Sequence, residues 1–142
     1  MARLIEFITN HWMLCVAFVV VAYLLIQELI DNVFNRYNAI TPIAAVVQMN
    51  NTETVIIDVS EANEYKKGHI NEAINVPMSK LDQKLGMLEK YKNTPMLVNC
   101  HTGAKSAPAC KKLYKLGFKQ VTNLIGGIQA WEDQKLPINR SS

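Results

Sequence analysis

The chain has 142 residues, of which 49% are hydrophobic and 19% charged, and its formal net charge is +3. This length suits one domain of ordinary size, and the abundance of apolar side chains excludes a wholly disordered chain. Three cysteines are too few for a small scaffold held together by disulfide bonds. The mean hydropathy of +0.03 conceals two parts of different character, because many of the apolar residues stand together near the N-terminus.

The N-terminal part contains an unbroken apolar run from Trp12 to Ile26, WMLCVAFVVVAYLLI. Apolar residues on either side extend the run, so a helix over about residues 10–30 approaches the ~20 residues that a bilayer requires. A cleaved signal peptide is disfavoured because Arg3 is the one basic residue before the run and no small-residue cleavage site follows it. A buried core helix is disfavoured because the run carries no polar stripe. We therefore expect an uncleaved, single-pass transmembrane helix that contacts the lipid bilayer.

The orientation of this helix depends on few charges, with Arg3 before it and Arg36 after it. Because free cysteines remain reduced in the cytoplasm, we expect the C-terminal part to face the cytoplasm. Cys15, inside the run, is interpreted as a small apolar residue. The predicted organisation is a membrane anchor with its connector over residues 1–38 and a second domain over residues 39–142.

The second domain alternates predicted strands and helices after a polar connector at residues 31–40. Thr41 and Pro42 provide a cap and a first-turn proline for the first helix, Ser79 is predicted to cap the second, and Gly117 to close the third. The predicted strands cover residues 54–59, 73–76, 95–99 and 120–124, and the predicted helices cover 42–49, 80–91, 107–116 and 127–135. This alternation predicts an α/β fold, with a parallel sheet covered by helices on both faces.

The strongest candidate for a functional site follows the predicted strand at residues 95–99, because ligands in such folds bind at the carboxyl ends of strands. Cys100 stands between this strand and a helix, where backbone N–H groups and the helix dipole stabilise an anion. This setting favours the thiolate, the nucleophilic form of cysteine. Gly103 lets the backbone curl around the sulfur, and Lys105, with His101, adds positive charge. A buried structural cysteine is the alternative that this pattern leaves open.

Other residues of possible chemical interest have plainer interpretations. Cys110, in the middle of a predicted helix, is interpreted as a packing residue, and the scattered histidines predict no metal site. A lysine cluster lacks stacking aromatics beyond Tyr114, so we expect a solvated helix face and no nucleic-acid partner. The cluster consists of Lys105, Lys111, Lys112, Lys115 and Lys119.

Three motifs follow one another along the second domain. The first comprises D-V-S at 58–60, E-Y at 64–65, G-H-I at 68–70, Ala73 and N-V-P at 75–77; the second is C-H-T-G-A-K-S at 100–106; the third is G-G-I-Q-A-W at 126–131. In this order and spacing they resemble the rhodanese-like domain, a sulfurtransferase family, over about residues 39–137. One such domain behind an N-terminal anchor also resembles small rhodanese-like proteins of the bacterial inner membrane. The parts around Gly68 and His69 and around Trp131 are interpreted as structural.

The resemblance implies the rhodanese-like fold and a thiosulfate sulfurtransferase-like activity that needs neither a cofactor nor a metal. Cys100 would attack the outer sulfur of a donor such as thiosulfate, carry it as a persulfide, and pass it to a thiol or cyanide acceptor. The resemblance further implies a location in the bacterial inner membrane, with membrane proteins among the possible partners. The residues that it implies for substrate binding are His101, Thr102, Gly103, Ala104, Lys105 and Ser106.

Two departures from the family pattern keep a second hypothesis open. Ser60 stands where arginine is usual, and Lys105 stands where arginine is common and cannot offer the bidentate fork of a guanidinium group. The second hypothesis is therefore a catalytically weak binding or adaptor module at the membrane. A related phosphatase is disfavoured, because its longer loop would place an arginine at the position of Ser106.

Overall fold

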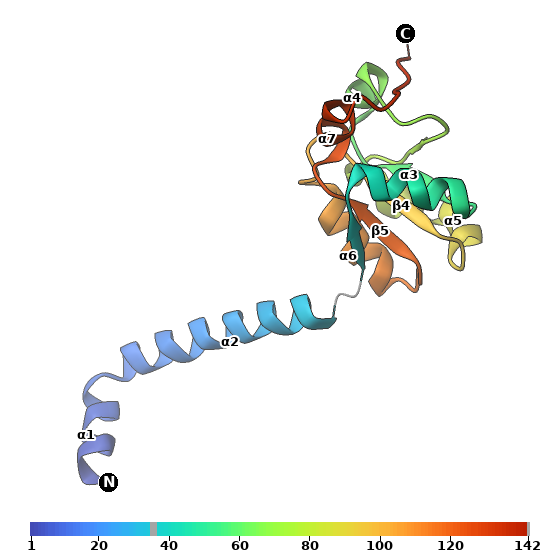
Figure 1. The fold of residues 1–142 in the computed structure, drawn as a ribbon. Coiled ribbons are helices and arrows are strands. Elements are labelled where there is room, and N and C mark those ends of the chain that lie inside the picture. The colour runs from blue at the N-terminus through green and yellow to red at the C-terminus, as the bar shows by residue number, and fades with distance from the viewer. Residues whose placement is uncertain (35–36, 142) are drawn as a thin grey trace. The chain divides into compact units, whose positions relative to one another are not determined.

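The computed structural model describes residues 1–34 and 37–141, and the chain divides into two compact units, Met1–Arg36 and Tyr37–Ser142. The first unit consists of α1 (Ala2–Asn10) and α2 (Trp12–Phe34), separated by a break at His11 (Figure 1). No residue of α1 is buried. The stretch Trp12–Ile30 of α2 is long and apolar enough to cross a membrane, and none of it is buried within the protein.

The predicted connector at residues 31–40 is wrong at both ends. Helix α2 continues to Phe34, and strand β1 (Asn38–Ile40) already belongs to the sheet of the second unit. Residues 35–36 of the connector, including the Arg36 used for the orientation of the anchor, lie outside the described residues. Strand β1 escaped prediction because it is three residues long and pairs along one side only, with β5.

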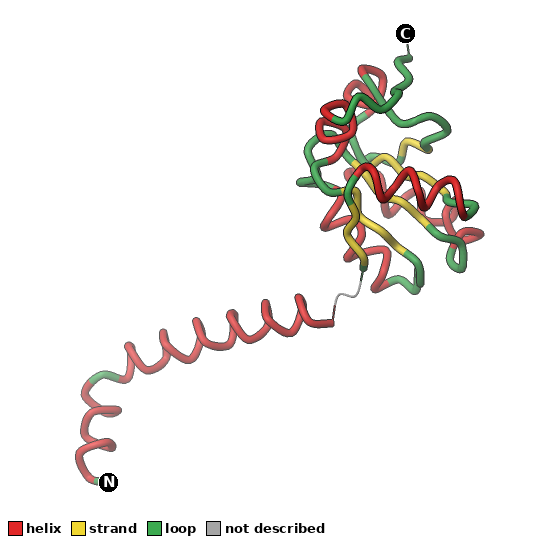
Figure 2. The backbone as a smooth tube through the Cα atoms, in the orientation of Figure 1, coloured by secondary structure: helices red, strands yellow, loops and turns green. Residues whose placement is uncertain are grey.

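The second unit is built on a five-stranded parallel sheet in the order β1-β5-β4-β2-β3, with helices around it (Figure 2). The remaining strands are β2 (Val55–Asp58), β3 (Ile74–Asn75), β4 (Met96–Asn99) and β5 (Val121–Leu124). The helices are α3 (Pro42–Asn51), α4 (Ala62–Lys67), α5 (Leu81–Leu88), α6 (Ser106–Lys115) and α7 (Gly127–Asp133), with 3-10 turns at Met78–Lys80 and Glu89–Tyr91. The structure confirms the predicted α/β fold.

The core lies on both faces of the sheet, because successive side chains of a strand point to opposite sides. In β4, Met96 and Val98 pack with buried residues of α5 and α6, whereas Leu97 packs with residues of α3 and α7. All four residues of β4 are buried, which explains its continuous apolar sequence. The central strand therefore ends in a fully covered position, and Cys100 follows it.

Two details of the helices differ from the prediction. Ser79 caps no helix: it lies in the 3-10 turn before α5, and its hydroxyl donates to a carboxylate oxygen of Glu61 at 3.2 Å. Glu61 instead begins α4, a helix absent from the prediction, which has only six residues and a reciprocal capping box between Glu61 and Glu64. The predicted cap at Thr41 is confirmed, since its hydroxyl accepts from the amide of Ala44.

Candidate active site

The thiol of Cys100 lies at the carboxyl end of β4, at the start of the loop that leads into α6. The amide of Gly103 donates a hydrogen bond to Sγ of Cys100 at 3.0 Å. Gly103 adopts a φ of +91°, which lets the backbone turn back toward the sulfur at little steric cost. Cys100 is 1% exposed, so the loop holds the sulfur in a covered position with a backbone donor directed at it.

The six residues predicted to bind substrate form one continuous loop but differ in exposure. Gly103 is half-buried, and the loop's outer rim is exposed and consists of His101, Thr102, Ala104 and Lys105. Ser106 is fully buried at the start of α6, where its hydroxyl donates to the carbonyl oxygen of Gly103 at 3.2 Å. Ser106 therefore fixes the loop, and four of the predicted residues remain available to a ligand.

The first turn of α7 contacts this loop, and this contact was not predicted from the sequence. The amides of Ile128 and Gln129 donate to the carbonyl oxygens of Cys100 and His101, at 2.9 and 3.1 Å. A Cβ atom at Gly127 would overlap the carbonyl oxygen of Cys100 and lie 2.8 Å from the amide nitrogen of Gly103. Two successive glycines between a strand and a helix were the available signal of such a close approach.

Asp58 and Asn99 face each other in the register of β2 and β4, and Asn99 directly precedes Cys100. The Asp58 carboxylate is fully buried and accepts hydrogen bonds from the amide of Ser60 at 2.8 Å and from Nδ2 of Asn99 at 3.3 Å. Burial raises the pKa of Asp58, and the hydrogen bonds from Ser60 and Asn99 oppose this rise. Asp58 thus joins the ends of β2 and β4 through uncharged hydrogen-bond donors. The family commonly has an arginine two residues further on, at the position of Ser60.

Lys105, on the exposed rim of the loop, forms an ion pair with Glu64 of α4, with an Nζ to Oε2 distance of 3.6 Å. The same Oε2 atom accepts the amide of Glu61 at 3.2 Å, as part of the capping box. Both partners are partly exposed, so the pair is worth little in stability. It keeps a cation beside the loop that carries Cys100.

The third cysteine of the chain, Cys110 on α6, belongs to the same buried cluster as Cys100. Burial strongly raises the pKa of the Cys110 thiol, and the charge of Cys100 raises it further. The thiol therefore remains protonated, in agreement with the packing role predicted for it. Nearby on the same helix, Lys112 pairs with Asp82 at 2.6 Å, which neutralises part of the predicted lysine cluster.

The motif around His69 holds together the edge of the domain. The rings of Tyr65 and His69 stack with centroids 3.8 Å apart, and the Tyr65 hydroxyl donates to the carbonyl oxygen of Ala73 at 2.7 Å. The backbones of His69 and Asn139 exchange two hydrogen bonds.

Within residues 1–34 and 37–141, no three histidine, cysteine or acidic side chains gather as metal ligands would.

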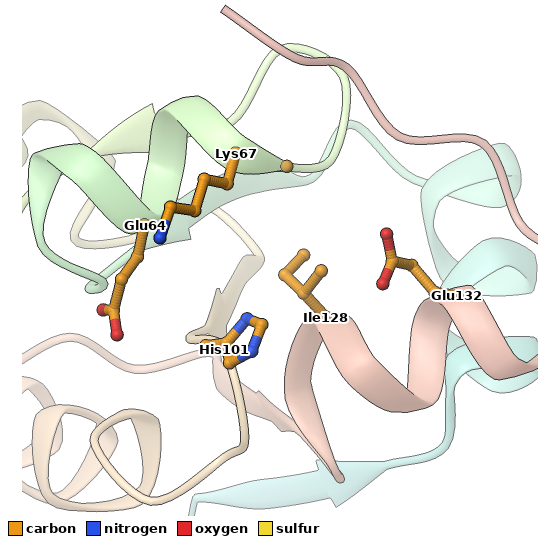
Figure 3. A pocket seen from close by; sticks show the side chains of 6 residues that line it. Glu64, Lys67, His101, Ile128 and Glu132 are labelled. Atoms are coloured by element: carbon orange, nitrogen blue, oxygen red, sulfur yellow. The ribbon is translucent and has the colours of Figure 1, made fainter.

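A pocket of about 300 Å³ adjoins the loop, between α4 and α7 (Figure 3). Glu64 and Lys67 extend from the α4 side, Ile128 and Glu132 from the α7 side, and His101 lies between them. His101 directly follows Cys100, so the pocket lies next to the residue that bears the thiol. The lining residues are Glu64, Lys67, Gly68, His101, Ile128 and Glu132.

The fold and the loop are those of a rhodanese-like domain. The family described as Rhodanese-like domain matches residues 43–134, more than half of the chain, and the protein belongs to this family. A solved structure of a rhodanese-related protein from Thermoplasma volcanium superposes with a TM-score of 0.66 at 30% sequence identity, covering 72% of this chain and 98% of that one.

Two relatives extend this result along the chain. The chain is 27% identical over 141 residues to a protein from Escherichia coli K12 named Uncharacterized protein YibN, covering 99% of each. It is 33% identical over 96 residues to the thiosulfate sulfurtransferase GlpE of Coxiella burnetii, covering 68% of this chain and 88% of GlpE. The first similarity extends over nearly the whole chain and so includes the N-terminal helices, whereas the second covers about two thirds of it.

Proposed function

We propose that this protein is a membrane-anchored sulfurtransferase that carries sulfane sulfur on Cys100. The observation that carries the proposal is the 3.0 Å hydrogen bond from the Gly103 amide to Cys100 Sγ, in a loop between a buried strand and a helix. A preorganised backbone donor stabilises negative charge on sulfur without any rearrangement of solvent. Membership of the rhodanese-like family, and a relative named thiosulfate sulfurtransferase, support the same chemistry.

The proposed reaction is a double displacement on sulfur. The Cys100 thiolate attacks the outer sulfur of thiosulfate, the sulfur–sulfur bond of thiosulfate breaks, and sulfite leaves with the electron pair of that bond. A thiol or cyanide acceptor then attacks the outer sulfur of the Cys100 persulfide and releases the Cys100 thiolate. Lys105 lies where it attracts the anionic donor, and the loop amides hold the charge that remains on the persulfide.

Sulfur loading tests this proposal directly. We expect the full-length protein in detergent micelles, incubated with thiosulfate, to gain the mass of one sulfur atom, and Cys100→Ser to gain none. Cys15→Ala serves as the matched control, because it removes a cysteine of the apolar helix and leaves the loop intact. Absence of added sulfur on the wild type, or equal addition to Cys100→Ser, contradicts the proposal.

The proposed anchor is residues 1–38, with α2 crossing the bacterial inner membrane and residues 39–142 in the cytoplasm. The apolar, unburied stretch Trp12–Ile30 supports this arrangement. A Ser141→Cys variant in a Cys100→Ser background tests it with a membrane-impermeant maleimide, since Ser141 is exposed. We expect labelling in inverted membrane vesicles and protection in intact spheroplasts, and the reverse pattern contradicts the orientation.

A binding or adaptor module is the second candidate function. Cys100 is 1% exposed and the amine of Lys105 is paired with Glu64, two features that favour a protected loop over a readily accessible one. An adaptor keeps its partners without the thiol. Crosslinking of the Cys100→Ser variant in cells therefore separates the two functions, because retention of all partners and of the cellular phenotype supports the adaptor.

A further inference from the structure

The pocket between α4 and α7 adjoins the loop that carries Cys100, and Ile128 links the two, since it lines the pocket and its amide donates to the carbonyl oxygen of Cys100. His101 also connects the two, because it lines the pocket, follows Cys100 directly and is held by the amide of Gln129 at 3.1 Å. A volume of about 300 Å³ is at the lower end of the range for small-molecule sites. A ligand in this pocket therefore contacts His101, the residue that follows Cys100.

Three charged side chains line the pocket: Glu64 and Lys67 on the α4 side, and Glu132 on the α7 side (Figure 3). The carboxylate of Glu64 is already engaged, by Lys105 at 3.6 Å and by the amide of Glu61 at 3.2 Å. Unlike Glu64, the side chains of Lys67 on α4 and Glu132 on α7 take part in no hydrogen bond or ion pair among the described residues. One ammonium and one carboxylate thus remain to bind a ligand.

The α7 side of the pocket combines this charge with an apolar surface. Ile128 is 2% exposed and lines the pocket one turn before Glu132 on the same helix. The carboxylate of Glu132 reaches toward α4, since a Cβ atom placed on Gly68 would lie 3.9 Å from its Oε1 atom. Ile128 therefore gives the pocket an apolar contact between Lys67 and Glu132 (Figure 3).

We infer that this pocket binds the thiol acceptor, and that the acceptor is a small zwitterionic thiol of the amino-acid class. Its ammonium group lies beside Glu132 and its carboxylate beside Lys67, so its sulfur is brought to the loop at His101. The inference rests on the proposed sulfur transfer. In the step itself the acceptor thiol loses its proton and attacks the outer sulfur of the Cys100 persulfide; the bond from that sulfur to Sγ breaks, a persulfide forms on the acceptor, and Cys100 takes up one proton as a thiol.

The contributions of Lys67 and Glu132 to acceptor binding can be measured separately by the choice of acceptor thiol. Sulfite release from thiosulfate is measured for the full-length protein in detergent, with cysteamine (ammonium only), 3-mercaptopropionate (carboxylate only) and cysteine (both). We expect Glu132→Gln to lower the ratio of kcat/KM for cysteamine to that for 3-mercaptopropionate by about threefold to fivefold, the worth of one partly exposed ion pair. Lys67→Gln is expected to raise the same ratio by a similar factor, and either change should lower kcat/KM for cysteine.

Neighbouring residues provide matched controls. Asp133→Asn and Lys66→Gln remove the same charges one residue away, on exposed side chains that do not line the pocket, and should leave the ratio unchanged. Glu132→Lys should shift the ratio further than Glu132→Gln, in the same direction.

Cyanide, which carries neither an ammonium nor a carboxylate group, distinguishes failure of the inference about the pocket from failure of the sulfurtransferase proposal. If wild-type protein releases sulfite with cyanide but the ratio stays constant in both pocket variants, the inference is overturned and the sulfurtransferase proposal stands. If wild-type protein releases no sulfite with any acceptor, the sulfurtransferase proposal fails, and the inference fails with it.

Discussion

The backbone amide of Ile128 donates a hydrogen bond to the carbonyl oxygen of Cys100 over 2.9 Å, and so the first turn of α7 holds the residue that bears the thiol. The amide nitrogens at a helix N-terminus need acceptors, and the loop's carbonyl oxygens provide them. The loop carbonyls are thereby directed toward α7, which frees the amide of Gly103 to face Sγ of Cys100. The motifs at 100–106 and 126–131 consequently form one structural unit.

Gly127→Ala tests this unit. Gly127 adopts a φ of +61°, and its added Cβ would overlap the carbonyl oxygen of Cys100. We expect a loss of at least about 2 kcal/mol in the free energy of unfolding, from the left-handed backbone conformation and the steric overlap together. Denaturant unfolding of the full-length protein in detergent measures this loss, and thiosulfate loading of Cys100 should fall in the same variant.

Gly86→Ala is the control for this prediction. Gly86 lies within α5, and a Cβ there meets nothing within 4 Å. We expect this variant to gain about 0.5–1 kcal/mol in the free energy of unfolding, because alanine restricts the unfolded chain and suits a helix better. Equal stability of Gly127→Ala and Gly86→Ala contradicts the proposed contact between α7 and the loop.

Lys105 offers a second test, because it stands where the family commonly has arginine. Its amine lies beside the loop and pairs with Glu64 at 3.6 Å. We expect Lys105→Ala to raise KM for thiosulfate about fivefold with little change in kcat, since an exposed cation contributes about 1 kcal/mol to anion binding. Lys105→Arg should lower KM, because the guanidinium fork binds an oxyanion through two hydrogen bonds.

Lys119→Ala is the matched control for the substitutions at Lys105. Lys119 is an exposed lysine of the same predicted cluster but precedes β5 and lies outside the loop. Its removal lowers the net charge by the same amount. A rise in KM as large as that of Lys105→Ala assigns the effect to overall charge and contradicts a local role for Lys105.

The central strands were predictable because their sequences are continuous and apolar. Strands β2 and β4 lie within the predicted ranges 54–59 and 95–99, since a strand buried on both faces needs apolar side chains at every position. Strand β1 and helix α4 were not predictable, because three and six residues are too few to establish a periodic pattern. Their positions depend on tertiary contacts with β5 and with the loop.

For the site, the sequence singled out the loop that carries Cys100 but not the residues that surround it. Cys100 and Gly103 were recognisable from a strand, a cysteine and a glycine in close succession. The pairing of Lys105 with Glu64 and the contact of Gly127 with the loop join residues more than twenty positions apart. Such pairs leave no local signal in a single sequence, so the pocket between α4 and α7 became visible only in three dimensions.

The two cysteines of the domain should differ in reactivity. Burial and the charge of Cys100 raise the pKa of Cys110, so its reactive thiolate form stays scarce at every pH used for labelling. We expect iodoacetamide to modify Cys100 of the native Cys15→Ala protein while Cys110 remains unmodified, with no increase at Cys110 between pH 7 and 9. Peptide mass spectrometry measures both sites, and denatured protein, in which both react, is the control. Modification of Cys110 at the rate of Cys100 contradicts this account.

The burial of Asp58 predicts that the stability of the protein depends on pH, and it determines the direction of that dependence. Desolvation raises the pKa of its carboxylate in the folded protein above the ordinary value of 3.8. A raised pKa of an acid means that its contribution to stability is fully present below the unfolded-state value and is lost as the pH rises through the folded-state value. Wild-type protein should therefore lose stability with rising pH relative to Asp58→Asn, whose side chain carries no charge.

The difference in free energy of unfolding between wild type and Asp58→Asn isolates this one carboxylate from all others. Trp131, which is 2% exposed, reports unfolding by fluorescence in a Trp12→Phe background. We expect the difference, wild type minus variant, to fall as the pH rises from about 3.8, with a slope of at most about 1.4 kcal/mol per pH unit. Above the raised pKa the difference becomes constant. A difference that instead rises with pH shows that the hydrogen bonds from Ser60 and Asn99 outweigh burial, and that Asp58 is held as a stabilised anion beside the loop.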